Sequence, residues 1–231
     1  MAKRRAVALP GFVEDALDGV LDKALQLQRP VIRAHLDRIR ERHRDVGPDE
    51  LIRLLERRYL GAVIAIGAAS GGAAAVPGAG TAASLASAAL EISAFTEATA
   101  LFALAMAEVH GLRIDDPHMR RAIVLAILLG DSGVEVAEIA AAGAGSRWGQ
   151  VVGRRAPEET IHRVNHALSK HFLARFGSRQ GALAFGRALP LGIGAGIGGA
   201  GNAALGRGAV SAARRMFGPP PDKLPPRVID A

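Results

Sequence analysis

The feature that most constrains this chain is an uncharged stretch of small residues at positions 61–80, with the sequence GAVIAIGAASGGAAAVPGAG. No Lys or Arg occurs between Arg58 and Arg113, whereas the sequence on both sides of this interval is rich in arginine. A surface that faces water carries polar and charged side chains, so such a block is expected in the centre of a helical protein or in a membrane.

The composition favours one large helical domain. Of the 231 residues, 49% are hydrophobic but only 4% are aromatic, so Ala and Gly supply much of the apolar content and allow helices to approach closely. No stretch alternates as a strand does. We predict an all-α fold, a single multi-helix bundle built around Gly/Ala-rich central helices. The formal net charge of +7 favours anionic partners.

The expected organisation has three parts. Residues 1–11 form a flexible basic N-terminus, residues 12–217 form the helical domain, and residues 218–231 form a disordered Pro-rich tail. Pro10 and Glu14 interrupt the apolar part of the N-terminal segment, so no secretory signal is expected. The absence of Cys excludes a disulfide framework, and the expected compartment is the cytoplasm.

Apolar periodicity, together with proline and glycine positions, predicts a series of helices. They cover residues 12–28, 31–44, 49–59 with a continuation to 76, 81–109, 117–129, 132–142, 157–176 and 192–216. Thr81, Asp116 and Ser132 are the predicted N-caps, the last by capping-box spacing. Gly111 and Gly130 are the predicted stops.

Glycines recur at helical spacing in two segments of the chain. The candidate helix-packing glycines are Gly67, Gly71, Gly192, Gly194, Gly196 and Gly198. Rows of small residues four apart let helix backbones touch, so we expect the two segments to pack on each other. Asn202 continues one row and is expected to hydrogen-bond across the contact. Gly206, taken to lie beyond the row, is expected to tolerate a larger side chain better.

The second glycine segment also matches the dinucleotide-binding pattern G-x-G-x-x-G. That function requires a preceding strand and an acidic residue about 20 positions later. Here Pro190 precedes the glycines and arginines follow them, so we expect no cofactor.

Glu97, Glu108 and Asn202 are the candidate buried polar residues. A carboxylate among apolar neighbours is unfavourable unless it is paired, so an interhelical ion pair or hydrogen bond is favoured over a functional acid. His162 and His166 lie one helical turn apart, a spacing that can bind zinc, but the Glu of H-E-x-x-H is missing between them. We predict neither a metal site nor a set of catalytic residues.

Arginines follow one face of the helix predicted over residues 31–44. The candidate membrane-facing residues are Arg29, Arg33, Arg40 and Arg44. A basic amphipathic helix can lie on an anionic membrane, and the alternative is a solvated face over a protein core. The uncharged part at residues 61–76 is shorter than the ~20 residues that a spanning helix needs. We expect a cytoplasmic protein associated with the inner face of the cell membrane, and the rival is an entirely soluble bundle.

Two motifs resemble the EcsC protein family of bacteria. The first comprises SGGAAAVPGAGTAA at residues 70–83 and HGLRIDDPHMRRAIVLAILLG at residues 110–130, similar to the family's glycine-rich turn, long helix and G-x-x-x-D-D-P-x-x-R helix start. The second is LPLGIGAGIGGAGN at residues 189–202, in which Pro190, Gly194, Gly198 and Asn202 recur at spacing four.

The resemblance covers residues 12–218, with one departure. Where the family usually has an Asp in the turn after Pro77, this chain has Gly80 and Thr81, so no role for that carboxylate is carried over. The resemblance implies a helical protein without an established activity, from a family named after an operon that also encodes an ABC transporter.

These features predict a non-enzymatic, membrane-associated helical protein that binds membrane lipid or a membrane protein. The alternative is a soluble, hydrolase-like helical enzyme with a buried acid such as Glu97 in a pocket. Nucleic acid is not an expected partner, because the basic faces lack interleaved aromatic residues for stacking.

Overall fold

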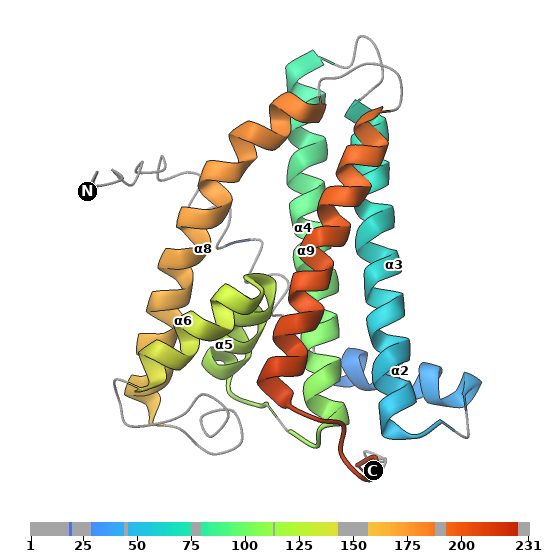
Figure 1. Ribbon diagram of the computed structural model, residues 1–231, viewed down its shortest axis with the longest axis vertical. Coiled ribbons are helices and arrows are strands. Elements are labelled where there is room, and N and C mark those ends of the chain that lie inside the picture. The colour runs from blue at the N-terminus through green and yellow to red at the C-terminus, as the bar shows by residue number, and fades with distance from the viewer. Residues whose placement is uncertain are drawn as a thin grey trace.

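A computed structural model of the chain describes residues 19, 29–43, 46–74, 80–112, 114–142, 157–187 and 193–225. This part of the chain contains helices and no strands, which confirms the all-α prediction (Figure 1). The helices are α2 (Arg29–Arg42), α3 (Pro48–Ala74), α4 (Gly80–Val109), α5 (Pro117–Leu128), α6 (Asp131–Ala142), α8 (Glu158–Arg187) and α9 (Ile193–Phe217).

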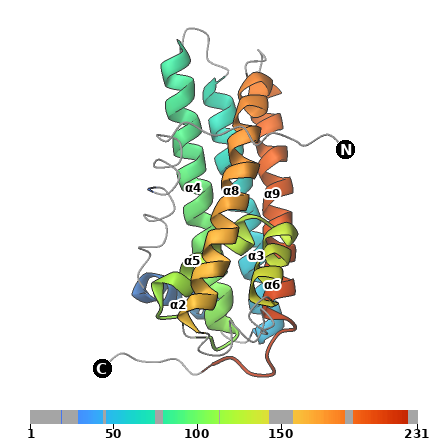
Figure 2. The same cartoon turned by 90° about the vertical axis from the view of Figure 1, so that its left-hand side faces the viewer.

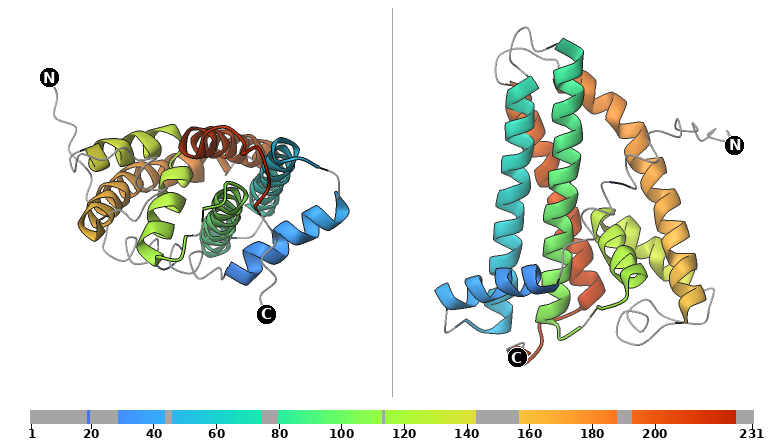
Figure 3. Two further views of the ribbon diagram at one scale, coloured as in Figure 1. Left: turned by 90° about the horizontal axis from the view of Figure 1, so that it is seen from below. Right: turned by 180° about the vertical axis from the view of Figure 1, so that it is seen from behind.

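Four long helices, α3, α4, α8 and α9, run along the long axis of the molecule (Figure 2). Helices α3 and α8 run in one direction, and α4 and α9 run in the other, so the C-terminal ends of the first pair and the N-terminal ends of the second lie together. We call this the upper end and the opposite one the base. Helix α2 crosses the base beside α3 and α4, and the short helices α5 and α6 separate α8 from α9 there (Figure 3).

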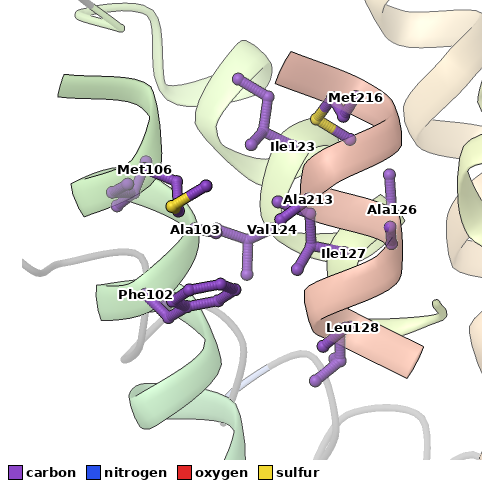
Figure 4. Packing of buried hydrophobic residues seen from close by; sticks show 14 of the residues in the cluster. Phe102, Ala103, Met106, Ile123, Val124, Ala126, Ile127, Leu128, Ala213 and Met216 are labelled. Atoms are coloured by element: carbon purple, nitrogen blue, oxygen red, sulfur yellow. The ribbon is translucent and has the colours of Figure 1, made fainter. Parts of the chain in front are cut away.

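The hydrophobic core lies toward the base, where α4, α5 and α9 meet. Phe102 and Met106 of α4 point toward Ile123 and Ile127 of α5 and Met216 of α9 (Figure 4). Helix α5 is buried almost all round, since every residue from Ala122 to Leu128 is buried. A helix that is apolar on all sides needs neighbours on all sides, which places α5 between the longer helices.

Several helix ends follow the sequence predictions. Asp116 caps α5, and its side chain accepts hydrogen bonds from the backbone N–H groups of His118 (2.7 Å) and Met119 (3.3 Å). Gly111 has a φ of 73°, and the N–H of Leu112 reaches back to the carbonyl of Ala107, the bond expected of a Schellman motif. Gly130, with a φ of 71°, ends α5 as predicted.

Two predicted N-caps are wrong. Helix α4 begins at Gly80, so Thr81 is already helical. Helix α6 begins at Asp131, and the Ser132 hydroxyl donates to the carbonyl of Leu129 (3.1 Å) instead of accepting from a backbone N–H group. The sequence alone does not distinguish a Ser or Thr that caps a helix from one in the first turn whose hydroxyl donates to the carbonyl of a preceding residue.

One predicted continuation of a helix is confirmed, and one helix is longer than predicted. Helix α3 runs without a break from Pro48 to Ala74, which is the continuation that the sequence left open. Helix α8 extends to Arg187 instead of ending near residue 176, because its glycines weaken a helix without ending it. The helix predicted over residues 12–28 lies outside the described residues apart from Gly19.

Helix α9 ends at Phe217, where the helical domain was predicted to end, and Gly218 follows with a φ of 78°. The described tail, residues 218–225, contains no helix, and Leu224 packs against the core. Residues 1–11 and 226–231 lie outside the described residues.

Candidate functional site

The most extensive helix contact joins α3 and α9, which run antiparallel. Gly67 and Gly198 face each other at its centre, and a Cβ atom on either glycine would collide with the carbonyl oxygen of the other. A Cβ on Gly198 would also lie 3.6 Å from the Cα of Gly71. The structure therefore brings Gly67, Gly71 and Gly198 together at a contact between backbones.

Asn202 lies one turn beyond this contact and is 5% exposed. Its Nδ2 donates a hydrogen bond to the carbonyl oxygen of Val63 (3.1 Å). The buried amide therefore ties α9 to α3 next to the glycines, as the sequence led us to expect.

Gly206 does not lie beyond the row, but its surroundings agree with the expectation that it tolerates a larger side chain better than Gly198, because an added Cβ would meet side-chain atoms there and a backbone carbonyl at Gly198. Gly206 continues the same row, and a Cβ there would lie 2.8 Å from Cγ2 of Val63 and 3.1 Å from Cδ2 of Leu60. The open positions on α9 are Gly201 and Gly208, where an added Cβ would meet nothing within 4 Å. Gly194 and Gly196 lie in the first turn of α9, and the structure does not describe their surroundings; Gly192 lies outside the described residues.

Below the glycines, Tyr59 joins α3 to α4. Its hydroxyl lies 2.9 Å from Oγ1 of Thr99, and Oγ1 of Thr99 donates to the carbonyl of Phe95 (2.8 Å), so Tyr59 is the donor in the first bond. The ring of Tyr59 stacks on that of Phe102, with centroids 4.5 Å apart. Burial raises the pKa of Tyr59, so its hydroxyl stays protonated and keeps donating.

Near the base, Glu56 of α3 and Arg214 of α9 form a two-pronged ion pair. Nε and Nη2 of Arg214 donate to the two carboxylate oxygens of Glu56 at 2.7 Å and 2.6 Å. The Glu56 side chain is 8% exposed and that of Arg214 is 61% exposed. The hydrogen bond to Glu56 is the main cause that raises the pKa of Arg214. Sequence analysis missed this pair, because nothing near either residue signals a partner so distant in the chain.

Glu97 and Glu108 are half-buried, not buried as predicted. Glu97 accepts a hydrogen bond from the hydroxyl of Ser93 (3.2 Å). Both lie on a face of α4 that becomes open toward the upper end, where Leu90 is 71% exposed. The buried acids among the described residues are Glu56 and Glu91.

His162 and His166 are both exposed on α8. Nε2 of His162 lies 3.5 Å from a carboxylate oxygen of Glu158, and its ring is 4.7 Å from that of His118. Within the described ranges, no three His, Asp or Glu side chains are grouped so that they could hold a metal ion.

Of the four arginines predicted to form a basic face on α2, the structure describes the side chains of Arg33 and Arg40. Ile32, Leu36 and Ile39 are buried as expected, but Arg33 and Arg40 are only half-exposed. The exposed cations among the described residues of α2 are Arg38 and Arg42. The side chains of Arg29 and Arg44 lie outside the described part of the structure.

The upper parts of α3 and α9 expose apolar residues alone. We call these residues the apolar surface: Gly61, Ala62, Ile64, Ala65 and Ala69 of α3, with Ala200 and Ala204 of α9. No other residue is exposed between Arg58 and Gly72 of α3 or between Gly198 and Gly206 of α9. The two helices lie side by side, and Gly199 approaches the backbone of Ile64, so these residues belong to one surface.

One described helix is apolar and long enough to cross a bilayer by length and composition, over Leu90–Val109, and 61% of that window is buried in the protein. The window includes Phe95, Phe102 and Met106, which belong to the core. It therefore fits the core helix of a bundle.

Comparisons of the chain with protein-family models, with curated proteins and with solved structures give no match.

Proposed function

We propose that the chain is a non-enzymatic, membrane-associated helical protein that binds lipid or a membrane protein at the cytoplasmic face of the cell membrane. The observation that carries this proposal is the apolar surface of α3 and α9. A helix at the surface of a water-soluble protein carries polar residues on its outer face. Between Arg58 and Gly72 of α3, and between Gly198 and Gly206 of α9, no polar residue is exposed.

Removal of the apolar surface from water would provide the driving force for binding to a membrane or to a membrane protein. Apolar area gains about 25 cal/mol per Å² when it leaves water, and extended apolar patches on a monomer mark sites that bind proteins or membranes. The net charge of +7 favours an anionic surface as the partner.

The resemblance of the two sequence motifs to the EcsC family supports the same proposal. That family takes its name from an operon that also encodes an ABC transporter, so a transporter in the membrane is a natural protein partner under this hypothesis.

The proposal is tested by co-sedimentation of the full chain with vesicles of phosphatidylcholine, with and without phosphatidylglycerol. We expect the protein to pellet with the mixed vesicles and to be partly released by salt, because exposed charges are screened at high ionic strength. Recovery of the protein in the supernatant at every lipid composition and low salt would overturn the proposal.

A further inference from the structure

We propose that the face shared by α3 and α9 docks on one leaflet of an anionic bilayer, with the apolar surface inside the interface and Arg57 and Arg207 on lipid phosphates. This inference rests on the proposed function and adds the orientation of the protein and the residues that contact the headgroups.

The exposed face of each helix changes character along its length. On α3 the exposed residues are Arg53 and Arg57 toward the base, and then Gly61, Ala65 and Ala69 toward the upper end. These positions follow one another at spacing four, so they lie along one side of the helix.

Helix α9 shows the same change in the opposite direction along the chain. Ala200 and Ala204 are exposed first, and Arg207, Ser211 and Arg215 follow on the same side. Because the helices are antiparallel, both apolar parts lie toward the upper end and both basic parts lie toward the base (Figure 1).

On each helix there is a boundary between the basic and the apolar part of the exposed side. Contacts between α3 and α9 place these two boundaries at nearly the same level along the bundle. Asn202 bonds Val63 and Arg214 pairs with Glu56. Interpolation between these contacts puts Arg57 and Arg207 within about one helical turn of each other along the bundle axis, or roughly 5 Å. The two arginines therefore mark one edge of the apolar surface.

These two arginines are also the cations still available on this face. Arg53 pairs with Asp49 (2.7 Å), Arg214 with Glu56, and Arg215 with Glu138 (2.6 Å). Neither Arg57 nor Arg207 forms an ion pair within the described part of the chain, and both are exposed. A guanidinium group binds a phosphate through paired hydrogen bonds, so exposed arginines beside an apolar surface match the boundary between lipid phosphates and acyl chains.

The apolar surface is too short to cross a bilayer. From Gly61 to Ala69 it extends about 12 Å along α3, whereas the hydrocarbon core of a whole bilayer is about 30 Å thick, so the surface can lie on one leaflet but cannot span both. Helix α8 reaches the same end, but its sequence there contains Arg179 and Arg187, so we assign the contact to the α3–α9 side.

The absence of Cys makes the orientation directly measurable. Single cysteines are introduced by Ala65→Cys or Ala69→Cys in the apolar surface, and by Val31→Cys on α2 or Ile139→Cys on α6 as controls. Val31 is 50% exposed and Ile139 is 67% exposed, so a label at either control site is tolerated. Each variant carries the fluorophore NBD and is added to phosphatidylglycerol–phosphatidylcholine vesicles with brominated acyl chains.

We expect quenching by bromine at Ala65→Cys and Ala69→Cys and none at the controls. Quenching at Val31→Cys or Ile139→Cys alone would overturn the inference while leaving membrane association intact. Failure of every variant and of the unmodified protein to bind vesicles would overturn the proposed function as well. A spectral shift at Ala65→Cys without lipid, growing with protein concentration, would instead show that a second copy of the chain covers the surface, and would also overturn the inference.

The headgroup contacts are tested by Arg57→Gln/Arg207→Gln against Arg42→Gln/Arg163→Gln, which removes the same charge from exposed positions on α2 and α8. We expect the first pair to weaken binding to anionic vesicles by roughly ten- to thirty-fold, since each arginine near an anionic surface strengthens binding by about five-fold. Equal weakening by both pairs would show that net charge alone drives binding, and would overturn the assignment of Arg57 and Arg207.

Discussion

At the scale of single residues, Gly67, Gly198 and Asn202 determine how closely α3 and α9 approach. The two glycines leave room for backbone to meet backbone, and the amide of Asn202 uses that proximity to reach the carbonyl of Val63. A side chain at either glycine would separate the helices and weaken this hydrogen bond.

Gly198→Ala and Gly201→Ala form a matched pair, because the same methyl group is added to the same helix on different sides. We expect Gly198→Ala to lower the free energy of unfolding by about 1–3 kcal/mol, since the methyl would overlap the backbone of Gly67. At Gly201 the added methyl group would meet nothing within 4 Å. Gly201→Ala should therefore raise the free energy of unfolding by up to ~1 kcal/mol, because Ala has the higher helix propensity. Urea unfolding followed by circular dichroism measures both, and equal changes in the two variants would contradict the close backbone contact.

At the scale of helices, Glu56 and Arg214 fasten the lower parts of α3 and α9. Glu56 is buried and depends on Arg214 for two hydrogen bonds, so loss of the guanidinium leaves a carboxylate with poor access to water. The partly exposed position of Arg214 limits the cost, because water can replace part of the interaction.

Arg214→Gln should therefore lower the free energy of unfolding by about 1–3 kcal/mol. The double variant Glu56→Gln/Arg214→Gln should lose less stability than the sum of the two single variants. It contains neither charge, so no charge is left without its partner. Arg207→Gln, on the same helix, is the control and should change stability by less than ~0.5 kcal/mol. Additive single effects in thermal or urea unfolding would show that the pair does not couple the helices.

The elements also show which features the sequence could predict. The rows of glycines, the cap at Asp116 and the stops at Gly111 and Gly130 are local patterns. The structure shows the cap and both stops where they were predicted, and it shows Gly67, Gly71 and Gly198 in one contact. The Glu56–Arg214 pair joins residues 158 positions apart, and no local pattern encodes it.

Two other features differ from the sequence predictions: the end of α8 and the exposure of the arginines on α2. Helix α8 continues past its internal glycines to Arg187, because a glycine lowers helix propensity without ending a helix. The arginines of α2 follow a regular row, but Arg33 and Arg40 are half-buried where α2 packs on the bundle. Periodicity identifies a face, and only packing shows whether water reaches it.

At the scale of the whole molecule, charge is distributed unevenly along the bundle. No charged residue occurs between Arg58 and Glu91 or between Arg187 and Arg207, and antiparallel packing brings much of both intervals to the upper end. The core lies toward the base. Toward the upper end, α4 lies along one side of α3 and α9 (Figure 3), and the apolar surface is exposed on a side that no described helix covers.

The most direct test of membrane association through the apolar surface compares Ala65→Glu with Ala34→Glu. Both residues are exposed alanines in helices, and each substitution changes the net charge by the same amount. The account predicts that Ala65→Glu weakens binding to anionic vesicles by roughly ten-fold, because a carboxylate would have to enter the apolar interface. Ala34→Glu, on α2, should leave the affinity within about threefold of the unmodified protein, and the melting temperatures of both variants should stay near that of the unmodified protein because both positions are exposed. Equal affinities of the two folded variants would contradict the account.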